Sequence, residues 1–171
     1  MRKVFVLILG TLFVCTLVGC GTDPNEKSVA NTISCLTSTS DVIKQVTKTL
    51  NDGVSEAKKN NKPLAKDKVN KATEEAAKLK EWATALQNIK AEIEMRKEGV
   101  TKEQKEELAK KHKAAFQQAL ADLDDAQKKL ETALKDADAV ADAEGKAALE
   151  VLRGKLKEGQ DEFEVLTKRQ T

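Results

Sequence analysis

Residues 108–140 read LAKKHKAAFQQALADLDDAQKKLETALKDADAV, and this stretch decides the fold. Its mostly apolar positions recur at steps of three and four, which is the spacing of one face of an α-helix. The face comprises Leu108, His112, Ala115, Ala119, Leu123, Ala126, Leu130, Ala133, Ala137 and Val140. Phe116, Leu120 and Leu134 widen it on one side. We therefore expect this helix to contact two neighbouring helices.

The same periodicity extends along the chain in both directions and predicts four helices. Their expected ranges are 28–60, 63–98, 102–142 and 146–168. Pro63 cannot continue the first helix but suits the first turn of the second, and Gly99 ends the second. After Val140 the apolar positions slip by one to two residues. This slip indicates either a stutter in one continuous helix or a new helix, and we favour a break between Asp142 and Gly145.

These helices predict an all-α fold. Short connections between long helices favour elongated antiparallel hairpins, assembled into a coiled-coil-like bundle of three to four helices over residues 28–171. The chain has no tyrosine and four phenylalanines. Its hydrophobic residues are rich in alanine, so the core should be thin and the helices should approach closely. No segment alternates apolar and polar residues between turn signals as a strand does.

The first residues have the features of an export signal. Arg2 and Lys3 carry the only charges before Cys20, and residues 4–19 are uncharged. A basic start followed by a short apolar run is typical of a secretory signal peptide. The apolar run is shorter than the ~20 residues that a membrane-spanning helix needs. We therefore expect residues 1–19 to be removed and the bundle to follow a cleaved signal.

Leu17-Val18-Gly19-Cys20 resembles the lipobox of bacterial lipoproteins. The resemblance implies that the Cys20 thiol carries diacylglycerol, that cleavage precedes Cys20, and that the new amine is acylated, for example with palmitate. Cys15 fits the motif less well, because bulky Phe13 and Val14 precede it. Residues 20–27 would form a lipidated tether. The implied location is the bacterial cell membrane or outer membrane, facing the periplasm or the exterior; the alternatives are a plain secretory signal or an uncleaved anchor.

The net charge and the single histidine argue against nucleic-acid binding and against a metal site. The chain has 30 basic and 28 acidic residues, and loss of Arg2 and Lys3 leaves 28 of each. A neutral chain without an aromatic platform gives no reason to expect nucleic-acid binding. His112, the only histidine, lies among lysines that would repel a metal ion. We expect no metal, no cofactor and no small-molecule substrate.

Cys35 is the one cysteine that remains after lipidation of Cys20 and loss of residues 1–19. It has no partner for a disulfide within the mature chain. A free, partly buried thiol is the favoured interpretation, and an intermolecular disulfide is the alternative.

Val100 and Thr101, with Gln104, resemble the L-T-x-x-Q motif of Spy/CpxP-type periplasmic helical proteins, with valine in place of leucine and in one copy. The resemblance implies a chaperone-like protein that binds unfolded clients during stress. The same residues also match a capping box, in which Thr101 and Gln104 stabilise the start of a helix.

The sequence therefore predicts a membrane-anchored helical lipoprotein of the cell envelope that is not an enzyme. It would serve as a scaffold, spacer or protein-interaction module, with an envelope protein or a second copy as its partner. The candidate contact stripe is formed by Leu108, Ala115, Ala119 and Leu123. The only histidine, His112, gives no sign of serving as the base for a serine nucleophile, and no glycine-rich phosphate loop is present. The sequence therefore offers no catalytic residues.

Overall fold

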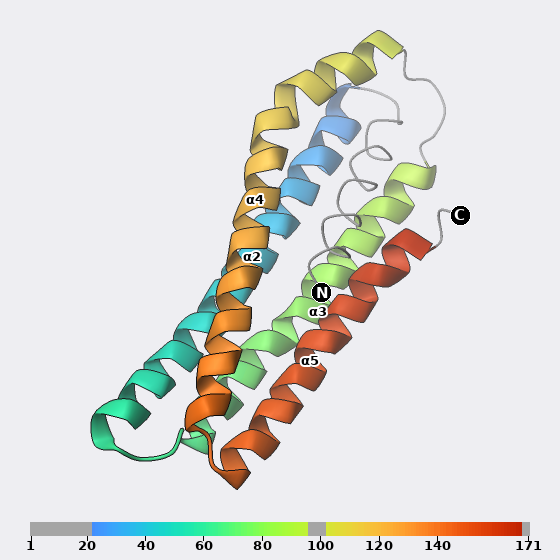
Figure 1. The fold of residues 1–171 in the computed structure, drawn as a ribbon. Helices are drawn as coiled ribbons and strands as arrows, with labels where there is room; N and C mark the ends of the chain where they lie inside the picture. The colour runs from blue at the N-terminus through green and yellow to red at the C-terminus, as the bar shows by residue number, and fades with distance from the viewer. Residues whose placement is uncertain (1–21, 96–101, 169–171) are drawn as a thin grey trace.

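The computed structural model describes residues 22–95 and 102–168, and these form four helices. Within them, side chains are described at 26–89, 91, 106–107 and 110–159. The helices are α2 (Thr22–Asn60), α3 (Lys66–Met95), α4 (Lys102–Val140) and α5 (Ala143–Lys168). No strand occurs in the described ranges, and the helices pack on one another. The predicted all-α bundle is confirmed (Figure 1).

The helices alternate in direction along the bundle, yet two of the main packing contacts join parallel helices (Figure 1). Thr49 bonds Glu75, which fixes α2 antiparallel to α3. Glu26 pairs with Lys111 and Ser40 bonds Asp122, so α2 and α4 run in the same direction. The predicted antiparallel hairpin is therefore well packed for α2 and α3. By contrast, α4 packs mainly on α2, α5 packs on α3, and α4 meets α5 only over a small area.

The helices with two extensive neighbours are thus α2 and α3, whereas the sequence pattern predicted two neighbours for the helix at 102–142. On α2, buried serines and threonines extend the packing face beyond its apolar positions. They are Ser28, Thr32, Thr39, Ser40, Thr47 and Thr49. The hydroxyls of Thr32, Thr39 and Thr47 each donate to the carbonyl oxygen four residues earlier, at 2.7–2.9 Å. Once bonded in this way, the side chains can be buried without an unsatisfied donor and they widen the face of α2.

Leucines and alanines share the core, as the composition indicates. The largest fully buried side chains include Leu36, Leu50, Leu86, Leu123, Leu149 and Leu152. Alanines occupy many of the remaining positions, among them Ala72, Ala76, Ala83, Ala126, Ala133 and Ala137. Because alanine adds little bulk, the helix axes can lie close together. Close packing of many small side chains, more than the burial of large apolar ones, must then stabilise the bundle.

The turn between α2 and α3 is a rigid cap and not the start of the second helix. Asn61 adopts a left-handed backbone conformation with φ of 48°, and the Lys62 amide donates to the Ala57 carbonyl at 3.0 Å, as at many helix ends. The predicted place of Pro63 in the first turn of a helix is wrong, because α3 begins at Lys66. Leu64 is buried, and its amide donates to Val140 at the end of α4. These contacts hold residues 62–65 across the end of the bundle.

The predicted break near Asp142 is confirmed, and one continuous helix is excluded. Helix α4 ends at Val140 and α5 begins at Ala143, three residues before the predicted start. Asp142 Oδ1 accepts a hydrogen bond from the Gly145 amide at 2.9 Å. Asp142 is therefore the N-cap of α5, and Gly145 lies inside its first turn.

Helix α2 also begins earlier than predicted. The sequence pattern gives residues 20–27 as a non-helical tether, whereas the helix starts at Thr22. Pro24 lies within its first turn, where backbone amides have no helical partner, so proline is tolerated there. The predicted stop of the second helix at Gly99 lies outside the described residues.

Removal of the N-cap should destabilise the bundle selectively. We expect Asp142→Ala to lower the free energy of unfolding by about 1 kcal/mol, because the Gly145 amide loses its acceptor. Urea denaturation followed by circular dichroism measures the change. Asp136→Ala is the control: Asp136 is exposed in the interior of α4, where alanine favours helix. Equal losses in the two variants would contradict the capping role.

Candidate functional site

The predicted lipidation site, Cys20, lies outside the described residues. Helix α2 begins at Thr22, so a lipid on Cys20 would be attached next to the first turn of that helix. Among the described helices, none combines the length and the apolar character that crossing a bilayer requires.

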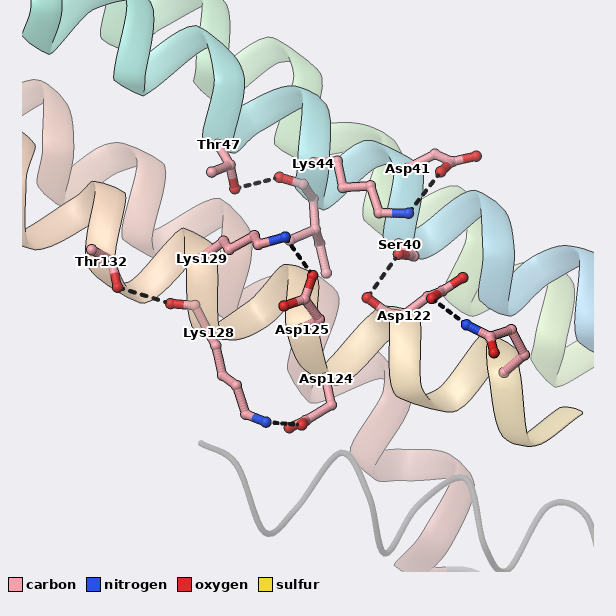
Figure 2. Close-up of polar contacts among 12 residues, drawn as sticks. Ser40, Asp41, Lys44, Thr47, Asp122, Asp124, Asp125, Lys128, Lys129 and Thr132 are labelled. Carbon is pink, nitrogen blue, oxygen red and sulfur yellow. Dashed lines mark hydrogen bonds and ion pairs between the residues drawn. The ribbon is translucent and has the colours of Figure 1, made fainter.

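The candidate contact stripe does not form one exposed surface. Ala119 is 4% exposed and Leu123 is 2% exposed, and both belong to the core. Ala115 is exposed, and the side chain of Leu108 is outside the described set. Near this stretch the Ser40 hydroxyl donates to the Asp122 carbonyl at 3.2 Å, which joins α2 to α4 (Figure 2). A partner could reach Ala119 and Leu123 only if α4 separated from α2.

The outward face of α4 is charged, and two of its ion pairs form within the helix. Asp124 pairs with Lys128, and Asp125 pairs with Lys129 at 2.7 Å, each one helical turn apart (Figure 2). Such exposed pairs contribute about 0.3–0.5 kcal/mol each to a helix. These pairs therefore contribute modestly to the stability of the helix.

A second polar cluster joins the first turns of α2 to α4. Lys111 Nζ lies 2.6 Å from Glu26 Oε1, and His112 Nε2 lies 3.8 Å from the same oxygen. The hydrogen bond from Lys111 lowers the pKa of Glu26, and the same bond raises the pKa of Lys111. His112 is partly buried, and its Nε2 has no hydrogen-bond partner. The cluster attaches the beginning of α2, next to the predicted lipid, to the rest of the bundle.

This cluster does not provide a metal site. The described side chains contain no group of three or more histidine, cysteine, aspartate or glutamate residues that could hold a metal ion. The cluster was not evident from the sequence, because Glu26 and Lys111 are 85 residues apart. Only the parallel pairing of α2 with α4 brings them together.

Cys35 lies in the core as a free cysteine, 6% exposed. Burial raises the pKa of its thiol, so the reactive thiolate is disfavoured. A disulfide between two copies through Cys35 would require α2 to leave its neighbours. The favoured interpretation from the sequence, a buried free thiol, agrees with this placement.

Cys35 should report on opening of the bundle. In the full chain carrying Cys15→Ser and Cys20→Ser, we expect Ellman's reagent to modify Cys35 at least ~10-fold more slowly under native conditions than in denaturant. The reason is that reagent and thiolate meet only after local opening. Rapid modification of the native protein would contradict the burial. Adding Cys35→Ala supplies the background rate.

The chain has no match in three comparisons: no family model, no curated protein and no solved structure matches it.

Proposed function

We propose that this protein is a lipid-anchored lipoprotein of the bacterial cell envelope, and that it acts as a rod-shaped, non-enzymatic scaffold or spacer. The observation that carries the proposal is Leu17-Val18-Gly19-Cys20 at the end of an uncharged run, directly before α2. Each buried methylene contributes about 0.8 kcal/mol to membrane attachment, so two or three acyl chains would anchor the protein stably.

The mature domain supports a structural role through its surface. Charged side chains on α4 form two ion pairs along the helix, and most of the described large apolar side chains belong to the core. Such a molecule would keep the membrane and a bound partner at a fixed distance and orientation. Its partners would be the membrane, through Cys20, and an envelope protein or a second copy, through polar helix faces.

The anchor is tested by Cys20→Ser in the full chain expressed in a bacterial host. We expect complete loss of the lipid mass on the N-terminal peptide by mass spectrometry, and loss of cleavage before residue 20, because serine lacks the thiol that accepts the lipid. Cys15→Ser is the matched control and should leave both unchanged. A cleaved, lipid-bearing Cys20→Ser protein, or a control that fails equally, would overturn the proposal.

A chaperone-like client binder is the second candidate, and it rests on the Val100-Thr101-Gln104 resemblance. Helix α4 could bind a client with its apolar face only after leaving α2, because that face is buried. Light scattering of an unfolding client protein tests this function. Suppressed aggregation at equimolar amounts would favour it, and unchanged aggregation would exclude it.

A further inference from the structure

Lysines are concentrated in the turn between α2 and α3 and in the helix ends beside it. Residues 58–71 read KKNNKPLAKDKVNK, with six lysines and one aspartate, and they form the end of α2, the turn and the start of α3. The hydrogen bond from Leu64 to Val140 places the turn between α4 and α5, with the exposed Asp142 and Glu144, beside this segment. The excess of lysine is therefore local to the α2–α3 turn.

Most of these lysines have no carboxylate partner. Lys68 pairs with Glu56 at 3.1 Å, and Lys66 lies 4.0 Å from Glu144. No ion pair found among the described side chains reaches Lys58, Lys59 or Lys62, and all three are exposed. We name these three the tip lysines. Lys58 and Lys59 lie in the last turn of α2, where positive charge also suits the helix dipole. Lys62 lies beyond the helix and has no such role.

The tip lysines are carried by a rigid turn at the far end of α2. The left-handed Asn61, the bond from Lys62 to Ala57 and the buried Leu64 hold the turn in one conformation. Helix α2 has 39 residues, so this turn lies about 58 Å from Thr22 at the helical rise per residue. In Figure 1 the turn projects at the end of the bundle opposite to the start of α2. The fixed backbone keeps the three lysines close together, so the turn itself need not become ordered on binding.

We propose that the tip lysines bind the anionic headgroups of a lipid bilayer. The turn lies at the end of the rod, where the three tip lysines can face a flat anionic surface. Clusters of lysine near a membrane are attracted to acidic lipids, with each lysine strengthening binding by about fivefold. The placement of this surface away from the anchored end rests on the proposed lipidation of Cys20, whereas the binding itself does not. A protein held at both ends would connect two bilayers.

Vesicle tethering tests the proposal with the full chain. The protein is inserted into neutral phosphatidylcholine vesicles, where either a lipid on Cys20 or the apolar residues 4–19 can hold it. Acceptor vesicles contain phosphatidylcholine and phosphatidylglycerol in equal parts, or phosphatidylcholine alone. Association is measured by energy transfer between labelled vesicles. Mass spectrometry of the N-terminal peptide is done separately, so failure of lipidation and failure of tethering are distinguishable.

We expect association with the anionic acceptors only, and a steep loss of association as salt screens the charges. The triple variant Lys58→Gln, Lys59→Gln, Lys62→Gln should need at least ~10-fold more acceptor for the same association. The control triple variant Lys48→Gln, Lys78→Gln, Lys113→Gln makes the same change in net charge at exposed positions along the helices. It should bind like the unmodified protein. Equal loss in both variants, or equal association with neutral acceptors, would overturn the proposal.

Discussion

Replacing Leu50 by alanine is expected to lower the free energy of unfolding by about 2–5 kcal/mol. Leu50 has no exposed surface and lies on α2, the helix that packs on both α3 and α4. The substitution removes apolar contacts and leaves a cavity. Neighbouring core positions are often alanine, whose side chains cannot move to fill the space.

The matched control for Leu50→Ala is Val151→Ala. Val151 is 59% exposed on α5, so its truncation should change stability by no more than about 0.5 kcal/mol. Urea denaturation followed by circular dichroism measures both variants. A loss below about 1 kcal/mol for Leu50→Ala would mean that α2 is not the tightly packed centre of the bundle.

Two glycines of α5 should respond to alanine in opposite directions. A Cβ added to Gly159 would lie 2.8 Å from the Cβ of Leu79, which is fixed to the backbone of α3 and cannot rotate away. The helices would have to separate, at a cost of about 1–3 kcal/mol. Alanine in place of glycine stabilises a helix by only about 1 kcal/mol, which is at most as large as that cost. We therefore expect net destabilisation by Gly159→Ala of up to about 2 kcal/mol.

Gly154 provides the comparison within the same helix. A Cβ at Gly154 would meet no atom within 4 Å, so Gly154→Ala should stabilise the protein by about 1 kcal/mol. Thermal and urea unfolding of the two variants give the signs directly. Stabilisation by both substitutions would show that α3 and α5 do not approach closely at Gly159.

The sequence pattern predicted the helices well where they are long and periodic. Residues 108–140 carry one face over many turns, so α4 was recovered almost to its ends. The phase slip after Val140 also located the break, because a change of face cannot occur within one straight helix. The early start of α2 was missed because residues 20–27, which include Pro24, were expected to form a tether, although the first turn of a helix accepts proline.

The pairing of helices could not be read from the sequence. An apolar face shows that a helix is buried on one side, but it does not identify the helix that covers it. The buried Thr32 and Thr39 were not counted in the face of α2, although their hydroxyls are bonded within the helix and can therefore be buried. The parallel contact of α2 with α4 followed only from the structure.

The features of the candidate site were predictable only where their signal is local in the sequence. Cys20 was recognised from four consecutive residues, which is a purely local signal. The lysines of residues 58–71 are also visible in the sequence, but their place at the end of the rod depends on the fold. Ala119 and Leu123 were proposed as contact residues because of their spacing, which cannot distinguish a face that binds a partner from one that packs internally.

Helix α2 connects the predicted anchor to the lysine turn through one uninterrupted element. If a membrane pulls on Cys20 while a second surface holds the turn, the tension runs along the axis of this one helix. The backbone hydrogen bonds of α2 are then loaded lengthwise, and its side chains slide in shear against α3 and α4. Shear must disrupt many contacts at once, whereas peeling breaks them one by one. The bundle should therefore resist extension along its long axis, because α3 and α4 hold α2 in place.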